Sequence, residues 1–329
     1  MLVAFLKFII SVFMAVACTA TAPFSLWTRS DYTPLDKENV KLTFATMSDI
    51  HLTDSSFRRM MLELGLADLN DSEYMLDALC LVGDNTDHGY IEQYENLKMA
   101  FSKYTPAKTI NMVMGNHDTW TEDDGTKLAH EYYYKYNKEI TGVDTDNVYF
   151  SRTINGYHII NICSEMDYTS AYISDEQLSW LDGELEKASR DNLPIFVFSH
   201  WPINNTHGLP GTWEIGVTEP MAGGLGLQSD AVDAILQKYQ NVFYITGHVH
   251  SGFTNDFTGN IYKYNSVEKH GNITCVNLPC YMYFSYKGVV VDGTGYVFEV
   301  YDNKVEIRAR NYIAGCWLNK YNYTIELTK

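Results

Sequence analysis

Side chains that can bind metal ions stand directly after five apolar runs of this chain. They lie in the segments Asp49-Ile50-His51, Gly83-Asp84-Asn85, Gly115-Asn116-His117-Asp118, Ser199-His200 and Gly247-His248-Val249-His250. Each preceding run is short and continuous, which is typical of a strand covered on both faces. Because ligands bind outside the carboxyl ends of strands in open α/β sheets, we expect the five segments to converge on one crevice.

The residue types and their spacing favour a site for two transition-metal ions. Imidazole and carboxylate together suit zinc, iron and manganese better than calcium or magnesium. Asp49 and His51 are two residues apart, so on an extended segment both side chains would point to one side, and the same holds for His248 and His250. Gly-Asn-His-Asp and Gly-His-x-His behind separate apolar runs are rare. The whole set, in this order, argues against a purely structural origin.

The elements that must position these residues alternate between strands and helices. We predict strands at Leu42–Met47, within Met75–Val82, and at Thr109–Met114, Tyr157–Ile162, Ile195–Phe198 and Val242–Thr246. Apolar spacing predicts a helix over Ile91–Tyr104, a capping box at Ser174 begins another, and Ser229 caps a third. Beyond Gly252, two-residue alternation predicts antiparallel strands that complete a second sheet.

The ordered motifs resemble those of the calcineurin-like metallophosphoesterases, over about residues 41–310. The resemblance implies an α/β fold of the metallo-dependent phosphatase-like type, a four-layer sandwich of two mixed β-sheets flanked by helices. It also implies two divalent or trivalent ions of manganese, iron or zinc. One ion would be held by Asp49, His51, Asp84 and His250, and the other by Asp84, Asn116, His200 and His248, with Asp84 shared.

The resemblance further implies a reaction, the hydrolysis of phosphate mono- or diesters by a hydroxide that bridges the two metals. His117 would contact the phosphoryl oxygen or protonate the leaving group, and Asp118 would orient His117. The alternative is a catalytically silent metal-binding scaffold of the same fold, which would be expected to lose some of these residues. A serine or cysteine hydrolase lacks support, because no Gly-x-Ser-x-Gly elbow is present.

The branch of the family is narrowed by the segment after Val82. Asp87 stands where purple acid phosphatases carry a tyrosinate, three residues after Asp84, and the first-motif His51 is present. Residues 83–89 are similar to the Gly-Asp-x-x-Asp-x-Gly of the cyclic-nucleotide phosphodiesterase-like and sphingomyelinase-like branches. Around these motifs, His88 lies either at the pocket rim or on an exposed loop. Trp120 and Trp213 could stack on a base or pack a lid, and packing is favoured for Trp201.

The charge of the chain limits its partners. With 24 Lys and Arg against 41 Asp and Glu, the formal net charge is −17, which argues against a nucleic-acid partner and a broad basic face. Two divalent ions, two carboxylates and one hydroxide would still leave the crevice at about +1, because bound ions are the largest local charges. A small phosphate ester is therefore the expected substrate. The sequence leaves the oligomeric state open.

The first residues have the layout of a secretory signal, with Lys7 before an apolar run and small residues around Ala17. We therefore expect an exported protein, with the leader cleaved, retained as an anchor or lipidated at Cys18, and membrane contact only through that leader. Six cysteines exclude a disulfide scaffold, although Cys275 and Cys280 could pair. The expected parts are a leader (1–20), a linker (21–40), the phosphoesterase domain (41–310) with inserted irregular loops at 121–147 and 201–230, and a C-terminal extension (311–329).

Overall fold

The computed structural model describes most of the chain from residue 36 onward. The described residues are 36–72, 75–120, 125–166, 171–208, 224–254, 264–285, 288–290 and 293–328. The expected leader, most of the linker, Cys18 and Trp213 lie outside them, so the predictions about export and lipidation stay predictions. Among the described residues, no helix has the length and apolar character needed to cross a membrane.

The first sheet joins the start of the described chain to its end. Its strands run in the order β14-β13-β12-β1-β2-β3, and β15 also pairs with β13. β1, β2 and β3 are mutually parallel, whereas β12 joins β1 antiparallel. The strands are β1 (Leu42–Met47), β2 (Ala78–Val82), β3 (Thr109–Val113), β12 (Thr294–Val300), β13 (Lys304–Asn311), β14 (Cys316–Trp317) and β15 (Tyr323–Glu326).

The second sheet has six strands in the order β4-β5-β6-β7-β9-β8, with a parallel centre from β5 to β9 and antiparallel edges. A separate hairpin pairs β10 with β11. The strands are β4 (Phe150–Ile154), β5 (Tyr157–Asn161), β6 (Ile195–Phe198), β7 (Val242–Thr246), β8 (Val267–His270), β9 (Ile273–Asn277), β10 (Tyr283–Ser285) and β11 (Gly288–Val290). Both sheets are therefore mixed, as the resemblance implied.

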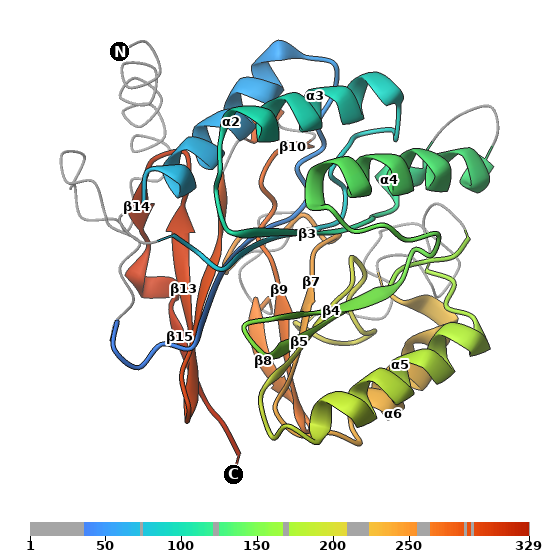
Figure 1. Ribbon diagram of the computed structural model, residues 1–329, viewed down its shortest axis with the longest axis vertical. Coiled ribbons are helices and arrows are strands. Elements are labelled where there is room, and N and C mark those ends of the chain that lie inside the picture. The colour runs from blue at the N-terminus through green and yellow to red at the C-terminus, as the bar shows by residue number, and fades with distance from the viewer. Residues whose placement is uncertain are drawn as a thin grey trace.

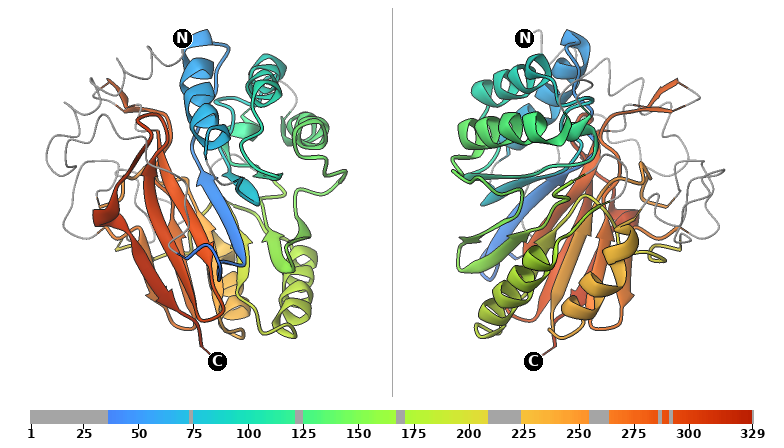
Figure 2. Two further views of the ribbon diagram at one scale, coloured as in Figure 1. Left: turned by 60° about the vertical axis from the view of Figure 1, so that its left-hand side comes forward. Right: turned by 90° about the vertical axis from the view of Figure 1, so that its right-hand side faces the viewer.

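Helices cover the outer faces of the sheets. Figure 1 shows α2, α3 and α4 grouped at one end of the molecule and α5 and α6 at the other, and both views of Figure 2 keep these two groups of helices apart. The helices are α2 (Ser56–Asn70), α3 (Ile91–Lys103), α4 (Gly125–Thr141), α5 (Asp175–Ser189) and α6 (Ser229–Leu236), and short 3₁₀ turns lie at η1 (His117–Thr119), η2 (Gly226–Gln228) and η3 (Asn319–Tyr321). The predicted four-layer sandwich is confirmed.

Two apolar cores explain why the central strands read as continuous apolar runs. Phe44 stacks on Phe298 with ring centroids 4.5 Å apart and meets Phe196 edge-on at 5.0 Å, so these rings fill the space between the two sheets. The alternate residues of the same strands, such as Ala45 and Val197, pack in the other core, beneath the helices. Each fully buried Phe contributes about 1.5–3 kcal/mol, so both faces of these strands are needed for stability.

Three predictions about the frame are wrong in detail. The strands beyond Gly252 were expected to complete the second sheet, and β8 and β9 do so, but β12 and β13 extend the first sheet, because β12 pairs antiparallel with β1. The expected irregular loop at 121–147 is largely the helix α4, which buries Tyr133 and Tyr136. Ser229 is the first residue of α6 and accepts a hydrogen bond from the backbone of Asn204, while Gln228 is the cap.

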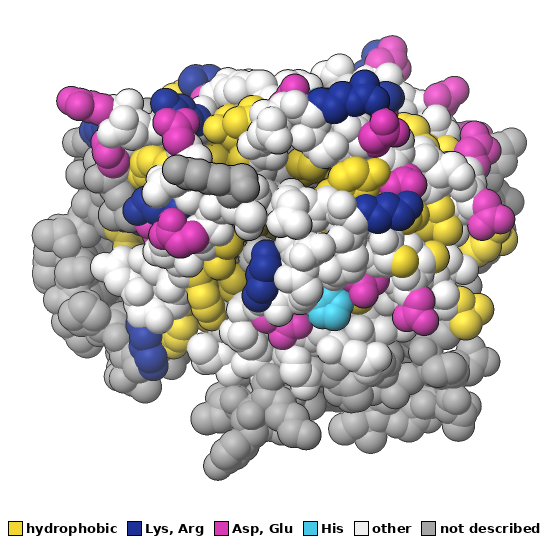
Figure 3. Space-filling model, turned by 90° about the horizontal axis from the view of Figure 1, so that it is seen from below, with side chains coloured by type: hydrophobic (Ala, Val, Ile, Leu, Met, Phe, Trp, Pro, Cys, Tyr) yellow, Lys and Arg dark blue, Asp and Glu magenta, His cyan; other side chains and the backbone are white. Residues whose placement is uncertain are grey.

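Ser174 caps α5 as predicted, since its side chain accepts from the backbone N–H of Gln177. The reciprocal half of the predicted capping box is not formed, because the backbone N–H of Ser174 donates to Glu165, and the Gln177 side chain bonds to Cys163 and Glu165. The end of the chain also belongs to the sandwich, because β14 and β15 both pair with β13. Figure 3 views the molecule from below, where α5, α6 and the C-terminus lie. On the described part of that face, Lys and Arg side chains stand singly or in small groups between acidic ones.

Candidate metal centre

The turns that follow the strands hold the predicted ligands in an unusual backbone conformation. The φ angles are positive at five of these residues, Asp49 (55°), His51 (46°), Asp84 (49°), His248 (71°) and His250 (46°). A left-handed residue other than glycine costs of the order of 1–3 kcal/mol and persists only where its surroundings enforce it. The pairs Asp49/His51 and His248/His250 do converge, but through these bent turns and not on the extended segments that the sequence predicted.

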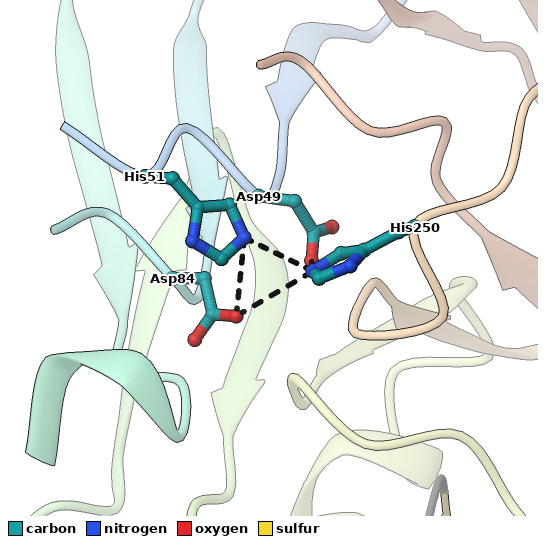
Figure 4. A group of neighbouring side chains, drawn as sticks. All are labelled: Asp49, His51, Asp84 and His250. Atoms are coloured by element: carbon teal, nitrogen blue, oxygen red, sulfur yellow. Dashed lines mark hydrogen bonds and ion pairs between the residues drawn. The ribbon is translucent and has the colours of Figure 1, made fainter. Parts of the chain in front are cut away.

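One group of side chains meets between β1, β2 and β7. His51 Nε2 lies 3.0 Å from His250 Nε2 and 3.5 Å from Asp84 Oδ2, and His250 Nε2 lies 3.3 Å from Asp49 Oδ1. Figure 4 shows the four side chains pointing toward one another, with Asp49 and His51 on the turn after β1 and Asp84 and His250 on two other turns. Ligands at about 2.0–2.2 Å from a metal ion are spaced by about 3.0–3.6 Å around it. The group therefore has the dimensions of a metal site.

A second group shares Asp84 with the first. Asp84 Oδ2 lies 3.1 Å from His200 Nε2, and the ligand atoms of Asp84, His200 and His248 lie within 4.8 Å of one another. Asn116 joins through its Oδ1, which lies 2.9 Å from His248 Nδ1. His200 is held by its other ring nitrogen, which donates to the carbonyl of Val82 at 2.8 Å. The structure thus brings together all seven predicted ligands, with Asp84 between the two groups.

Several buried ligand atoms in this part of the chain have no hydrogen-bond partner. They include Asp49 Oδ2, Asp84 Oδ2 and His200 Nε2, although the last two lie only 3.1 Å apart. Asp49, Asp84 and His200 are fully buried, and an unsatisfied buried polar group costs about 1–3 kcal/mol, with more for a charge. Metal ions would satisfy these atoms, and the imidazole and carboxylate donor set suits transition metals. The residues present therefore fit two such ions.

The four histidines divide into two protonation states in the metal-free protein. Burial alone would lower the pKa of His200, but Asp84 raises it to about 9, and Asp49 and Asp84 likewise raise the pKa of buried His250 to about 9. Burial lowers the pKa of His51 to about 4 and holds that of His248 well below its usual value. Two imidazolium groups thus balance two carboxylates until metal ions replace their protons.

Three glycines leave room for the ligands. A Cβ on Gly247 would lie 1.9 Å from Ser48 Oγ and 2.6 Å from Asp49 Oδ2. On Gly83, whose φ is +81°, it would lie 2.3 Å from His200 Nδ1, and on Gly115 it would lie 2.3 Å from Asp84 Oδ1. The glycines are therefore required by the close approach of backbone to ligand.

His117 stands beside the first group, at the start of η1. Its backbone N–H donates to Asp84 Oδ1 at 2.9 Å, and its ring packs edge-on against His51 at 4.5 Å. Nδ1 lies 2.9 Å from the carbonyl oxygen of Asp87, which can only accept a hydrogen bond, so Nδ1 carries a proton and Nε2 is the nitrogen that can exchange one. With its side chain 16% exposed, His117 is open to a ligand at the site.

The prediction that Asp118 orients His117 is wrong. The fully buried carboxylate of Asp118 accepts from the backbone N–H groups of Asn85, Thr86 and Gly115 and from the side chains of Asn85 and Thr86, at 2.7–3.2 Å. These bonds join the turns after β2 and β3. Asp118 therefore holds the frame of the site, while the tautomer of His117 is set by the backbone of Asp87.

Asp87 is the residue whose part in the site the sequence analysis missed. Its Oδ1 lies 3.1 Å from His51 Nδ1 and 3.8 Å from Arg58, and its Oδ2 lies 3.2 Å from His88 Nδ1. It thus orients a predicted metal ligand, as carboxylates beside ligating histidines do. The Gly-Asp-x-x-Asp-x-Gly spacing was the available signal.

The other residues that the sequence singled out differ in their exposure to solvent. Trp201 is fully buried, which confirms its packing role. Cys275 and Cys280 are both buried, and no disulfide joins them, so the possible pairing is not formed. Trp120, in contrast, is 38% exposed and stacks on His88.

Two sheets packed face to face, with one carboxylate shared between two groups of potential metal ligands at the strand ends, define an α/β sandwich protein with a candidate metal site. A comparison with known protein families identifies the family within this class. The family described as calcineurin-like phosphoesterase matches residues 42–252, and the chain belongs to this family.

Two curated relatives have names that refer to cyclic nucleotides. The chain is 28% identical over 186 residues to a probable cyclic nucleotide phosphodiesterase of Rhodococcus erythropolis, which covers 56% of this chain and 54% of the relative. It is 27% identical over 225 residues to a 3′,5′-cyclic-nucleotide phosphodiesterase of Nostoc sp., which covers 66% of this chain and 74% of that protein. The match thus spans about half the length of the Rhodococcus relative.

Solved structures share the fold. A dimetal phosphatase from Danio rerio has a TM-score of 0.59 at 13% identity and covers 88% of this chain and all of its own. A purple acid phosphatase from yellow lupin has a TM-score of 0.58 at 12% identity, over 87% of this chain and 53% of its own. A Plasmodium protein described as the anchor in the inner membrane complex reaches 0.55 at 15% identity, over 88% and 90%. At these identities the likeness extends to the fold alone.

Proposed function

We propose that this protein is a dinuclear metallophosphoesterase that hydrolyses small phosphodiesters, with cyclic nucleotides as the first candidates. The single observation that carries the proposal is Asp84, a buried carboxylate with an oxygen that lacks a hydrogen-bond partner and faces both groups of ligands. Family membership and the names of the two curated relatives support the reaction class and the diester preference.

Each metal ion would be bound by three residues of its own and by one shared residue. Asp49, His51 and His250 would hold one ion and Asn116, His200 and His248 the other, with Asp84 shared between them. Bound at these positions, two transition-metal ions would act as Lewis acids on the phosphoryl oxygens and supply hydroxide near neutral pH.

Beside this centre, His117 can act on the leaving group. Its Nδ1 proton is held by the carbonyl of Asp87, so a second proton on Nε2 is the one available for transfer. When protonated there, His117 can donate to the leaving oxygen, which contributes roughly 10²–10⁴-fold in general acid catalysis. Its backbone N–H meanwhile binds Asp84 Oδ1, so the catalytic histidine and the shared carboxylate keep a fixed relative position.

A turnover panel tests the proposal. The protein is loaded with manganese, zinc or iron and assayed on 3′,5′-cyclic AMP, bis-p-nitrophenyl phosphate, p-nitrophenyl phosphate and a glycerophosphodiester. We expect turnover of diesters above that of monoesters, its loss in Asp84→Asn, and no loss in the control Asp191→Asn, whose carboxylate lies at the surface beside His158. Metal binding without turnover of any ester would instead favour the silent scaffold. Turnover of monoesters alone would overturn the diester preference.

A further inference from the structure

An aromatic surface adjoins the metal centre on the side of His117. Trp120 meets the His117 ring edge-on with centroids 5.1 Å apart, and His88 stacks on Trp120 at 4.7 Å and 23°. Tyr90 continues the stack at 5.6 Å from His88, nearly parallel at 10°. We call Trp120, His88 and Tyr90 the aromatic wall. It extends a chain of rings that starts at the metal ligand His51, which lies 4.5 Å from His117.

The wall is anchored and partly open. Asp87 Oδ2 lies 3.2 Å from His88 Nδ1, and the backbone N–H of His88 donates to Gln93 at 2.8 Å. Trp120 is nevertheless 38% exposed and the His88 side chain 31% exposed, whereas Trp201, the packing tryptophan beside the same site, is fully buried. A large aromatic residue that is fixed in place but left partly open has the features of a ligand platform.

We propose that the aromatic wall binds a planar heteroaromatic ring of the substrate, a nucleobase, with Trp120 as the specificity-determining residue. The inference rests on the proposed function and adds the part of the substrate that the metals do not contact. The ring centroids are 4.5 Å apart from His51 to His117 and 5.1 Å apart from His117 to Trp120, so only the His117 ring separates the wall from the metal ligand His51.

The position beside His117 assigns the ring to the leaving-group side of the phosphorus. His117 faces the leaving oxygen in the proposed reaction, and Trp120 lies on its flank. Stacking of a base on an aromatic side chain tolerates differences between bases, because every base has a π-face. The wall therefore favours nucleotides over ring-free diesters without selecting one nucleobase strongly.

The activity test compares substrates with and without a ring. Trp120→Ala should lower kcat/KM for 3′,5′-cyclic AMP roughly 5- to 100-fold and leave a glycerophosphodiester within about twofold, while Trp120→Phe keeps most of the activity on the nucleotide. Trp180→Ala, which removes a partly exposed indole from α5, is the matched control and should change neither ratio. Equal losses of Trp120→Ala on both substrates would overturn the inference.

A binding test separates this inference from the proposed function. Calorimetry on the metal-loaded protein measures the dissociation constants of AMP and of ribose 5-phosphate, which differ by the adenine ring. The wild type should bind AMP at least about fivefold more tightly, and Trp120→Ala should remove that difference. Equal affinities in the wild type would refute the aromatic wall even if diesters are hydrolysed. Absence of turnover, with the AMP preference present, would refute the proposed function alone.

Discussion

Replacement of Asp118 by Asn tests whether this carboxylate supports the turns or the chemistry. Oδ1 accepts from the backbone and hydroxyl of Thr86, and Oδ2 accepts from the backbone and side chain of Asn85 and the backbone of Gly115. Asn must place an N–H₂ group where one of these oxygens was. At the Oδ2 position it would face three donors. At Oδ1 the Thr86 hydroxyl can rotate to accept, and one buried backbone N–H loses its partner.

The expected loss of stability is that of the less damaging of these two orientations of the Asn side chain. An unpaired buried N–H costs about 1–3 kcal/mol, and the remaining hydrogen bonds lose the strength that a charged acceptor gives them. Asp118→Asn should therefore lower the free energy of unfolding by about 2–4 kcal/mol, a large part of the 5–15 kcal/mol of a typical domain. Urea unfolding of the metal-free protein measures this change, with the surface variant Asp191→Asn as the control expected to unfold like the wild type.

The same variant also separates the two roles kinetically. If Asp118 supports the turns, its loss should reduce metal affinity and turnover on all esters together, because Asp84 and Asn116 lie in the turns that it joins. If Asp118→Asn is as stable as the wild type and loses turnover only on esters with poor leaving groups, Asp118 does not support the turns. Asp118 would then act through His117 after all.

Three further outcomes follow from the site. His117→Ala should keep about two metal ions per chain and lower turnover roughly 10²–10⁴-fold on esters with poor leaving groups. An equal loss of turnover on p-nitrophenyl esters would show that His117 does not protonate the leaving group. Metal binding at pH 7 should release at least two protons, because His200 and His250 have pKa values of about 9 and must lose their protons to bind metal. The metal affinity should therefore rise from pH 7 to 9. Calorimetry in buffers of different ionisation enthalpy measures the proton release, and a release of no protons would contradict this expectation. Gly247→Ala should reduce the metal content, since the added Cβ would lie 1.9 Å from Ser48 Oγ. The control Gly183→Ala should keep the wild-type metal content, because a Cβ there meets nothing within 4 Å. Equal metal content in the two variants would contradict the steric argument.

The strands of the frame were predictable because burial on both faces leaves a strong mark on the sequence. β1, β6 and β7 have the predicted bounds, and β2, β3 and β5 differ by a few residues at their ends. α2 gave no comparable signal, since its buried positions include Arg58 and Asp68, which interrupt the apolar stripe. Those charges are satisfied by distant residues, with Asp68 bound to Arg310 at 2.8 Å. Contacts between residues so far apart in the chain leave no local pattern.

The ligands of the site were predictable from their types and order, but their geometry was not. The convergence of His248 and His250 depends on left-handed turns that an alternation argument does not reveal. The part played by Asp118 depends on which groups come within reach of its carboxylate after folding. For Asp87 the spacing was visible in the sequence, but its contact with His51 is a property of the folded turns.

Anomalous diffraction from crystals of the manganese- or zinc-loaded protein would locate the metal ions themselves. We expect two peaks per chain, one between His51 and His250 and one between His200 and His248, with the Asp84 carboxylate between them and both peaks absent from Asp84→Asn. A single peak, or metal bound away from Asp84, would contradict the dinuclear centre on which the proposed function rests.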